Sequence, residues 1–190
     1  MAYYSAEKLA NFGFRSLGEN VKISDKASIY APEQIEIGDH SRIDDFCVIS
    51  GRVAIGSYSH ITPMCLIAGG EPGVFLSDFC TLAYGVFMFA QSDDFSGTSM
   101  VNSMIPKKYK REIKEPVFVG RQSVFGARTV VMPGVKVAEG CSFGAISLVN
   151  KSTSPWGVYV GQPARRVKER NKDLLELEEE FLAGIASDTP

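Results

Sequence analysis

A bulky aliphatic or aromatic residue recurs at every sixth position through most of this 190-residue chain. The 18 positions fall in four runs, which begin at Leu17, Ile37, Leu76 and Val119. An α-helix repeats every 3.6 residues and a flat strand every two, so neither alone produces this spacing. A chain that turns after each short strand, always in the same direction, brings every sixth side chain to a common axis. The spacing therefore predicts an all-β fold, a parallel β-helix built from hexapeptide repeats.

A second rule inside each hexad supports a narrow tube. The residue four places after the bulky one is small in 16 of the 18 hexads, and only Glu33 and Glu71 depart from this. A small inward residue fits a tight corner, where a larger one would collide with the next wall. Three hexads make an 18-residue coil, so we predict about six coils over residues 17–154. The coils start at Leu17, Ile37, Ile55, Leu76, Val119 and Val137.

The segments outside the repeat predict a loop and two end structures within a single domain of residues 1–190. Residues 94–118 interrupt the repeat, and loops of this length are usually functional. The open ends of a solenoid need covering. Residues 5–14 predict a capping helix with Ser5 as N-cap and Gly13 at its end. Residues 164–184 predict a C-terminal helix with an apolar stripe.

Composition narrows the functional class. The net charge of −2 and the lack of a basic face in the repeat argue against nucleic-acid binding. No apolar run has transmembrane length and no signal-peptide pattern begins the chain, so we expect a cytoplasmic protein with no membrane contact. The four cysteines occupy small inward positions, which predicts packing rather than disulfides. The γ-type carbonic anhydrases also have a β-helix fold, but they need three zinc-binding histidines and this chain has two histidines in all. We therefore expect no metal.

The segment "VGRQSVFGARTVVMPGVKVAEGCSFGAISLVN", with "GQPARRVK" after it, resembles the left-handed β-helix hexapeptide acyltransferases. The resemblance covers residues 17–168 and implies a left-handed coil, a homotrimer, and acetyl-CoA as cosubstrate in clefts between subunits. The N-terminal half is similar to the bacterial sugar acetyltransferases that include the viosamine acetyltransferase. That branch implies N-acetylation of a nucleotide-linked amino sugar, such as dTDP-4-amino-4,6-dideoxyglucose, for surface polysaccharide including lipopolysaccharide. The alternatives are a galactoside or polysaccharide O-acetyltransferase and a non-catalytic β-helix scaffold.

Three residues are candidates for the catalytic groups. In galactoside and maltose acetyltransferases the catalytic histidine closes the third hexad of the coil that carries the long loop, and Asp93 takes that place here. A hydroxyl acceptor needs a strong base, whereas a neutral amine is already nucleophilic, so Asp93 with Asp94 favours an amino-sugar acceptor. Both aspartates could instead cap the loop. His60, which closes the first hexad of the third coil, is the other candidate base, or else an unimportant surface histidine.

The resemblance also implies a CoA groove along the last coils. Backbone amides at two small-residue corners would hold the pantetheine arm, and the C-terminal segment would meet the adenine and the 3′-phosphate. The residues carried over are Gly126, Ala127, Arg128, Gly144, Ala145, Lys151, Pro163, Arg165 and Lys168. Arg128 stands where a small residue is common, which alters the groove. Five basic residues between Lys107 and Lys114 are either a solvated charge run or a site for a nucleotide-sugar diphosphate.

Overall fold

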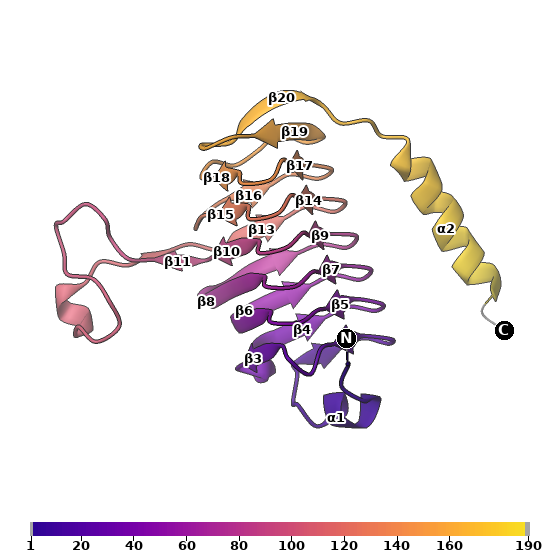
Figure 1. Cartoon of the computed structure of the whole chain (residues 1–190), viewed down its shortest axis with the longest axis horizontal. Helices are drawn as coiled ribbons and strands as arrows, with labels where there is room; N and C mark the ends of the chain where they lie inside the picture. The colour runs from indigo at the N-terminus through magenta and orange to yellow at the C-terminus, as the bar shows by residue number, and fades with distance from the viewer. Residues whose placement is uncertain (1, 189–190) are drawn as a thin grey trace.

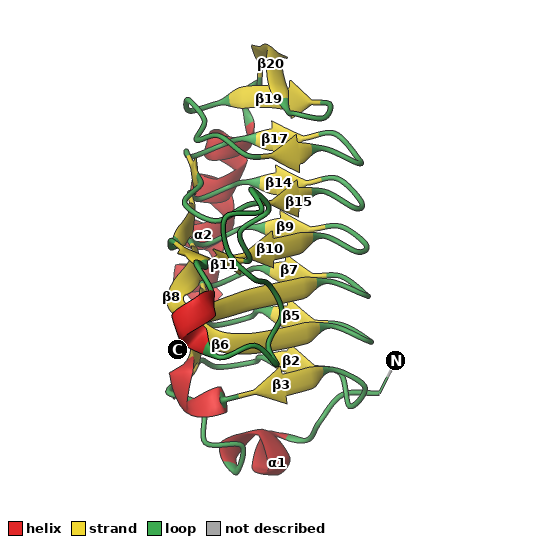
Figure 2. Ribbon diagram, turned by 90° about the vertical axis from the view of Figure 1, so that its left-hand side faces the viewer, coloured by secondary structure: helices red, strands yellow, loops and turns green. Residues whose placement is uncertain are grey.

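The computed structural model describes residues 2–188 and confirms the parallel β-helix (Figures 1 and 2). The predicted domain of residues 1–190 also includes Met1 and residues 189–190, which lie outside the described residues. Short strands stack coil upon coil, so the strands of the coils pair in parallel with those one coil away. The same hexad position therefore recurs at the same place on the wall, as in the pairing of Ile43 with Ile61 and of Ile61 with Leu82.

Two sheets form the walls. We call the outward side of the eight-stranded sheet the β7 face. Its strands are β2 (Lys22–Ile23), β5 (Arg42–Ile43), β7 (His60–Ile61), β9 (Thr81–Leu82), β14 (Val124–Phe125), β17 (Ser142–Phe143), β19 (Gly157–Val160) and the antiparallel β20 (Arg165–Glu169). The ten-stranded sheet covers the other two walls. Its strands are β1 (Ser16–Leu17), β3 (Ser28–Tyr30), β4 (Ile35–Ile37), β6 (Val48–Ile55), β8 (Leu66–Leu76), β10 (Phe87–Phe89), β13 (Val117–Val119), β15 (Val130–Val131), β16 (Lys136–Val137) and β18 (Leu148–Val149).

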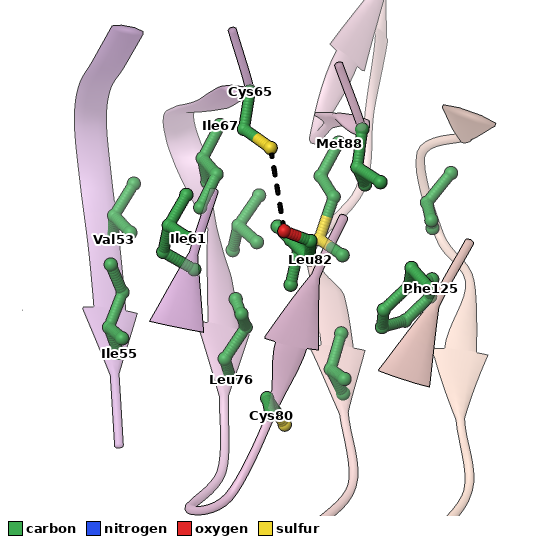
Figure 3. Close-up of a cluster of buried hydrophobic side chains, with 14 of the residues drawn as sticks. Val53, Ile55, Ile61, Cys65, Ile67, Leu76, Cys80, Leu82, Met88 and Phe125 are labelled. Carbon is green, nitrogen blue, oxygen red and sulfur yellow. Dashed lines mark hydrogen bonds between the residues drawn. The ribbon is translucent and has the colours of Figure 1, made fainter. Parts of the chain in front are cut away.

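The bulky hexad residues fill the tube. Ile61, Ile67, Leu82 and Met88 are fully buried and lie together in Figure 3. Further along, the rings of Phe125 and Phe143 stack at 4.8 Å between centroids. The predicted alternation of large and small inward residues thus yields a continuous apolar core, which is the main source of stability in such a fold.

The small inward residues have a second role at the corners. The hydroxyl groups of Ser123, Thr129 and Ser147 each donate to a backbone carbonyl three residues earlier, at 2.7 Å. These bonds satisfy carbonyl groups that face the interior. All four cysteines are buried and unpaired, as the repeat predicts. Burial raises the pKa of Cys80 to about 12, so this thiol stays protonated at neutral pH.

The solenoid is longer than the hexad count predicts. Strand β19 stacks in parallel on β17, with Tyr159 opposite Phe143, and so begins a seventh coil. The repeat does not reveal this coil because the sixth residue after Val149 is Pro155, and the next inward aromatic residue comes four places later. The prediction of about six coils therefore ends one strand too early.

The C-terminal segment also differs from its prediction. The helix expected over residues 164–184 is divided: residues 165–169 form β20, which pairs antiparallel with the open edge of β19, and α2 (Leu174–Asp188) follows. The unpaired backbone of β19 provides partners that a helix there would leave unused. Helix α2 returns along the body (Figure 1). Its Phe181 ring meets the rings of Tyr58 and Phe79 edge-on. No helix in the described part of the chain is both long and apolar enough to span a lipid bilayer.

The N-terminal helix forms as predicted but is shorter, and the long loop is present. Helix α1 (Ala6–Ala10) begins after Ser5, whose hydroxyl accepts from the Lys8 amide at 3.3 Å. Gly13, at φ +77°, lies beyond the helix. The long loop leaves the prism through the antiparallel pair β11 (Gln91–Ser92) and β12 (Ile113–Lys114) and projects outward (Figure 1). Residues 2–188 also contain two short 3₁₀ turns, at Pro32–Gln34 and Lys107–Tyr109.

The central core column generates the first prediction. We expect Ile61→Ala to lower the free energy of unfolding by about 2–5 kcal/mol, because it opens a cavity in a fully buried site. Ile61→Val is the matched control, with an expected loss of about 0.5–1.5 kcal/mol. Guanidinium unfolding followed by circular dichroism measures both. Equal, small effects of the two substitutions would contradict a tightly packed core at this coil.

Candidate active site

Residues in a strand alternate between the core and the surface, so the β7 face presents a column of outward residues that follows the register of the strands. Its members are Lys22, Arg42, His60, Thr81, Val124, Ser142 and Val158. Polar and basic side chains occupy the N-terminal coils of this column, whereas small and apolar ones occupy the later coils. The two ends of the face are therefore chemically different.

His60 belongs to a hydrogen-bonded network around a buried carboxylate. The Asp44 side chain is 2% exposed, and its Oδ2 lies 2.8 Å from His60 Nε2. Its Oδ1 accepts from Arg42 Nε at 2.6 Å and from the Tyr3 hydroxyl at 3.3 Å. A carboxylate only accepts, so Nε2 carries the proton and Nδ1 is the acceptor of the neutral ring. Burial would raise the pKa of Asp44, but the hydrogen bonds from Arg42 and His60 outweigh burial and hold the pKa below its usual value.

Sequence reasoning finds His60 and misses Asp44. The carboxylate that contacts His60 comes from the preceding coil of the same chain. Asp44 could have been found from the repeat, because Arg42 pairs with His60 in the parallel register and Asp44 lies two residues further along the same wall. The His60 side chain is 39% exposed, so the network reaches the surface.

Asp93 lies in a small pocket at the base of the projecting loop. Its Oδ2 accepts from the Asn102 amide at 3.3 Å, and its Oδ1 lies 3.7 Å from Lys110 Nζ. The pocket, of about 200 Å³, is also lined by Gln91, Ser92, Ser103 and Glu112. About one third of the Asp93 side chain is exposed, so a ligand can reach the carboxylate.

The Asp94 side chain forms its hydrogen bonds with residues of the loop. Its carboxylate accepts from the Ser96 amide at 2.8 Å and from the Thr98 and Ser99 hydroxyls, both at 2.9 Å. These hydrogen bonds lower the pKa of Asp94 well below its usual range. The contacts support the loop-capping alternative for Asp94.

One chain does not bring the two candidate bases together. His60 lies on β7 of the eight-stranded sheet, whereas Asp93 follows β11 of the projecting hairpin. Within residues 2–188, no hydrogen bond or ion pair joins the His60 network to the Asp93 pocket.

The two corners expected to hold the pantetheine arm are adjacent but have a structural role of their own. A Cβ on Gly126 would lie 2.5 Å from the Ala145 amide nitrogen, and one on Gly144 would lie 2.9 Å from Val160. Glycine is therefore required at both places by the close approach of the next coil. Ala127 and Ala145 complete these corners. Arg128 is exposed with φ +58°, and its amide donates to the Tyr84 carbonyl at 2.9 Å.

Two of the candidate basic residues meet at the C-terminal end of the solenoid. Lys151 and Arg165 line one pocket of about 310 Å³, together with Ser152, Thr153 and Arg166. Three cations and two hydroxyls suit a phosphate group, so this pocket fits an anionic part of CoA. Sequence reasoning missed Arg166, which follows Arg165 on β20.

The other two residues carried over for the cosubstrate lie outside that pocket. Pro163 and Lys168 are exposed, Pro163 after a cis peptide bond and Lys168 on β20 opposite Val158. In the described part of the chain, no group of three or more histidine, cysteine or acidic side chains is placed to hold a metal ion.

The Asp44 network generates a pH-dependent prediction. We expect Asp44→Asn to lower the free energy of unfolding at pH 7 by about 1–3 kcal/mol, because a buried charged acceptor is lost. The folded pKa of Asp44 lies below its ordinary value, so this contribution is complete above about pH 4 and declines as the pH falls through the folded pKa. Urea unfolding of both proteins at pH 7 and pH 3 measures the difference, which should shrink at pH 3. Asp25→Asn, at an exposed turn, is the control, and an equal loss there would contradict a special role for Asp44.

Known proteins resemble the whole chain. No family profile matches the sequence. The chain is 39% identical, over 191 residues and 99% of both proteins, to the dTDP-4-amino-4,6-dideoxy-D-glucose acyltransferase of Escherichia coli. The structure matches AntD, an N-acyltransferase from Bacillus cereus solved with dTDP and 3-hydroxybutyryl-CoA, at a TM-score of 0.96 and 43% identity, over 97% of this chain and 98% of AntD. A galactoside acetyltransferase solved with coenzyme A shares the fold at a TM-score of 0.58 and 20% identity, over 87% of this chain and 70% of that one. The chain therefore belongs to the dTDP-4-amino-4,6-dideoxyglucose acyltransferases, a branch of the left-handed β-helix acyltransferases.

Proposed function

We propose that this protein transfers an acetyl group from acetyl-CoA to the amino group of a nucleotide-linked sugar, such as dTDP-4-amino-4,6-dideoxyglucose. The observation that carries the proposal is the similarity, over nearly the whole chain, to an acyltransferase of that sugar in sequence and to an enzyme solved with dTDP and an acyl-CoA in structure. The likeness to the galactoside acetyltransferase concerns the fold alone, and Asp93 in place of a histidine favours an amine over a hydroxyl acceptor.

The chemistry needs a neutral amine and a leaving thiolate. The amine nitrogen attacks the thioester carbonyl carbon, a C–N bond forms, the C–S bond breaks, and the proton lost by nitrogen ends on sulfur to give free CoA. Asp93 suits the first step, because its exposed carboxylate can orient the ammonium form and accept a proton. The Asn102 amide and Lys110 hold that carboxylate at a fixed place at the base of the loop.

The chain's own residues at the far end would hold the cosubstrate. Lys151, Arg165 and Arg166 supply cations for its phosphates. The corners at Gly126 and Gly144 would supply backbone groups along the pantetheine arm. In this arrangement the thioester points from the C-terminal pocket toward the middle coils.

We further propose a cytoplasmic homotrimer that serves surface polysaccharide synthesis, including lipopolysaccharide. One corner of the prism carries exposed apolar side chains at Phe46, Met64 and Ile146, which suit burial against another copy of the chain. Assembly would also allow the projecting loop of one copy to approach the β7 face of another. Light scattering of the purified protein at several concentrations tests the trimer.

The proposed function predicts acceptor-dependent release of free CoA from acetyl-CoA. We expect turnover with dTDP-4-amino-4,6-dideoxyglucose and none with simple galactosides, as measured with a thiol reagent. Turnover on hydroxyl acceptors alone would establish an O-acetyltransferase, and no turnover with any acceptor, together with no CoA binding, would establish a scaffold. Preference for a longer acyl-CoA would support N-acyl transfer but show that the transferred group is not acetyl.

Separate substitutions assign the base. We expect Asp93→Asn to lower kcat by about 10²–10⁴-fold, because a positioned base is removed while the shape is kept. His60→Ala is the comparison, and we expect its kcat to stay close to that of the wild type. The opposite pattern would place the base at His60, with Asp44 as its positioning partner.

A further inference from the structure

A second polar pocket lies at the N-terminal end of the β7 face and has no part in the chemistry described above. It has a volume of about 380 Å³ and is lined by Asn20, Lys22, His40, Ser41 and Arg42. Three of these five side chains carry or can carry a positive charge. The pocket adjoins the Asp44 network, because Arg42 belongs to both.

Lys22 gives this pocket an uncompensated charge. Its side chain is exposed, and among the side chains of residues 2–184 no carboxylate lies within ion-pair distance of its ammonium group. By contrast, Lys26 on the same coil pairs with Asp45 at 3.3 Å. Arg42 beside it is paired with Asp44 at 2.6 Å, so the uncompensated charge that attracts an anion to this pocket comes from Lys22.

The remaining walls are held rigidly. The buried Asp44 carboxylate fixes Arg42 through Nε, and Arg42 also lies over the Tyr3 ring at 5.5 Å. His40 stacks on Tyr58, with ring centroids 4.9 Å apart. A site whose cations are fixed in advance loses little entropy when it binds an anion.

The position of the pocket along the solenoid indicates which substrate supplies the anion. The small-residue corners and the pocket of Lys151 and Arg165 occupy the later coils, so the acyl donor takes that end. The acceptor must then approach from the earlier coils. Coils lie about 4.8 Å apart, so coil two and the coil that carries the Asp93 loop are separated by about 10 Å along the axis, the scale of a sugar diphosphate.

The loop cluster that the sequence suggested for a diphosphate is less suitable. Lys110 lies 2.7 Å from Glu112, and Lys114 lies 3.5 Å from Glu71 and 3.6 Å from Glu112. The charges nearest the prism are thus already compensated by carboxylates. Lys107 and Lys108 belong to the 3₁₀ turn in the projecting part of the loop.

We propose that the pocket formed by Lys22, His40 and Arg42 binds the diphosphate of the nucleotide-linked acceptor. This inference rests on the proposed function for the identity of its ligand. It makes Lys22 a binding residue, and it divides the β7 face between an acceptor end and a donor end.

Calorimetric titration of the full-length protein with dTDP tests the site. We expect Lys22→Gln to weaken dTDP binding about tenfold, because one charge-assisted contact to phosphate is lost, while CoA binding stays unchanged. In the acyl-transfer assay the same variant should raise KM for the amino-sugar nucleotide about tenfold, with kcat within about twofold of the wild type. Lys107→Gln is the matched control and should leave dTDP affinity unchanged.

The outcomes separate the site from the function. Unchanged dTDP affinity in Lys22→Gln, a loss of CoA affinity instead, or a loss confined to Lys107→Gln would each overturn the site, and a wild-type protein that binds no dTDP would do the same. Turnover by the wild type combined with any of the first three results leaves the proposed function standing. Dependence of dTDP binding on Lys22 without turnover on any amino-sugar nucleotide would support the site and defeat the proposed function.

Discussion

The structure depends on the parallel register between successive coils. Each strand pairs with the strand one coil away at the same hexad position, so Ile43, Ile61 and Leu82 stack in one column. This register places every inward residue over its equivalent, and it therefore demands the alternation of large and small side chains. It also stacks the outward residues, which is why Arg42 and His60 become neighbours although eighteen positions separate them.

That outward stacking explains how a thin prism can form polar sites without a deep cavity. The carboxylate of Asp44 is buried because adjacent coils enclose it, and it still reaches Arg42, His60 and Tyr3. At the other end, the turn after Val149 and strand β20 close a basic pocket from residues that are distant in sequence. The later coils offer glycine at positions 126 and 144, where the Ala145 backbone and the Val160 side chain, respectively, lie too close for a Cβ.

The walls of the prism could be predicted from the sequence, whereas its C-terminal end could not. The period of six predicts the coils, the buried cysteines and the interruption by the loop, because the core repeats one geometric requirement. The seventh coil and β20 were missed because they satisfy a different requirement, the pairing of an exposed strand edge, for which residues 165–169 have no distinctive pattern. At the site, His60 was visible as a rare residue at an outward position. Asp44 was missed although the repeat places it close to His60, because the sequence alone does not show that neighbouring coils bury this outward carboxylate.

Helix α2 adds contacts between segments that are distant in sequence, which a simple solenoid lacks. Phe181 contacts Tyr58 and Phe79, and Glu178 binds Arg121, so the end of the chain touches three coils that are made long before it. In a simple repeat array each unit depends only on its neighbours. Here the rings of Tyr58 and Phe79 lack their contact with Phe181 until α2 has been made. A nascent chain that has not yet reached α2 therefore exposes more of these two rings than the folded molecule does, in which they are half-buried.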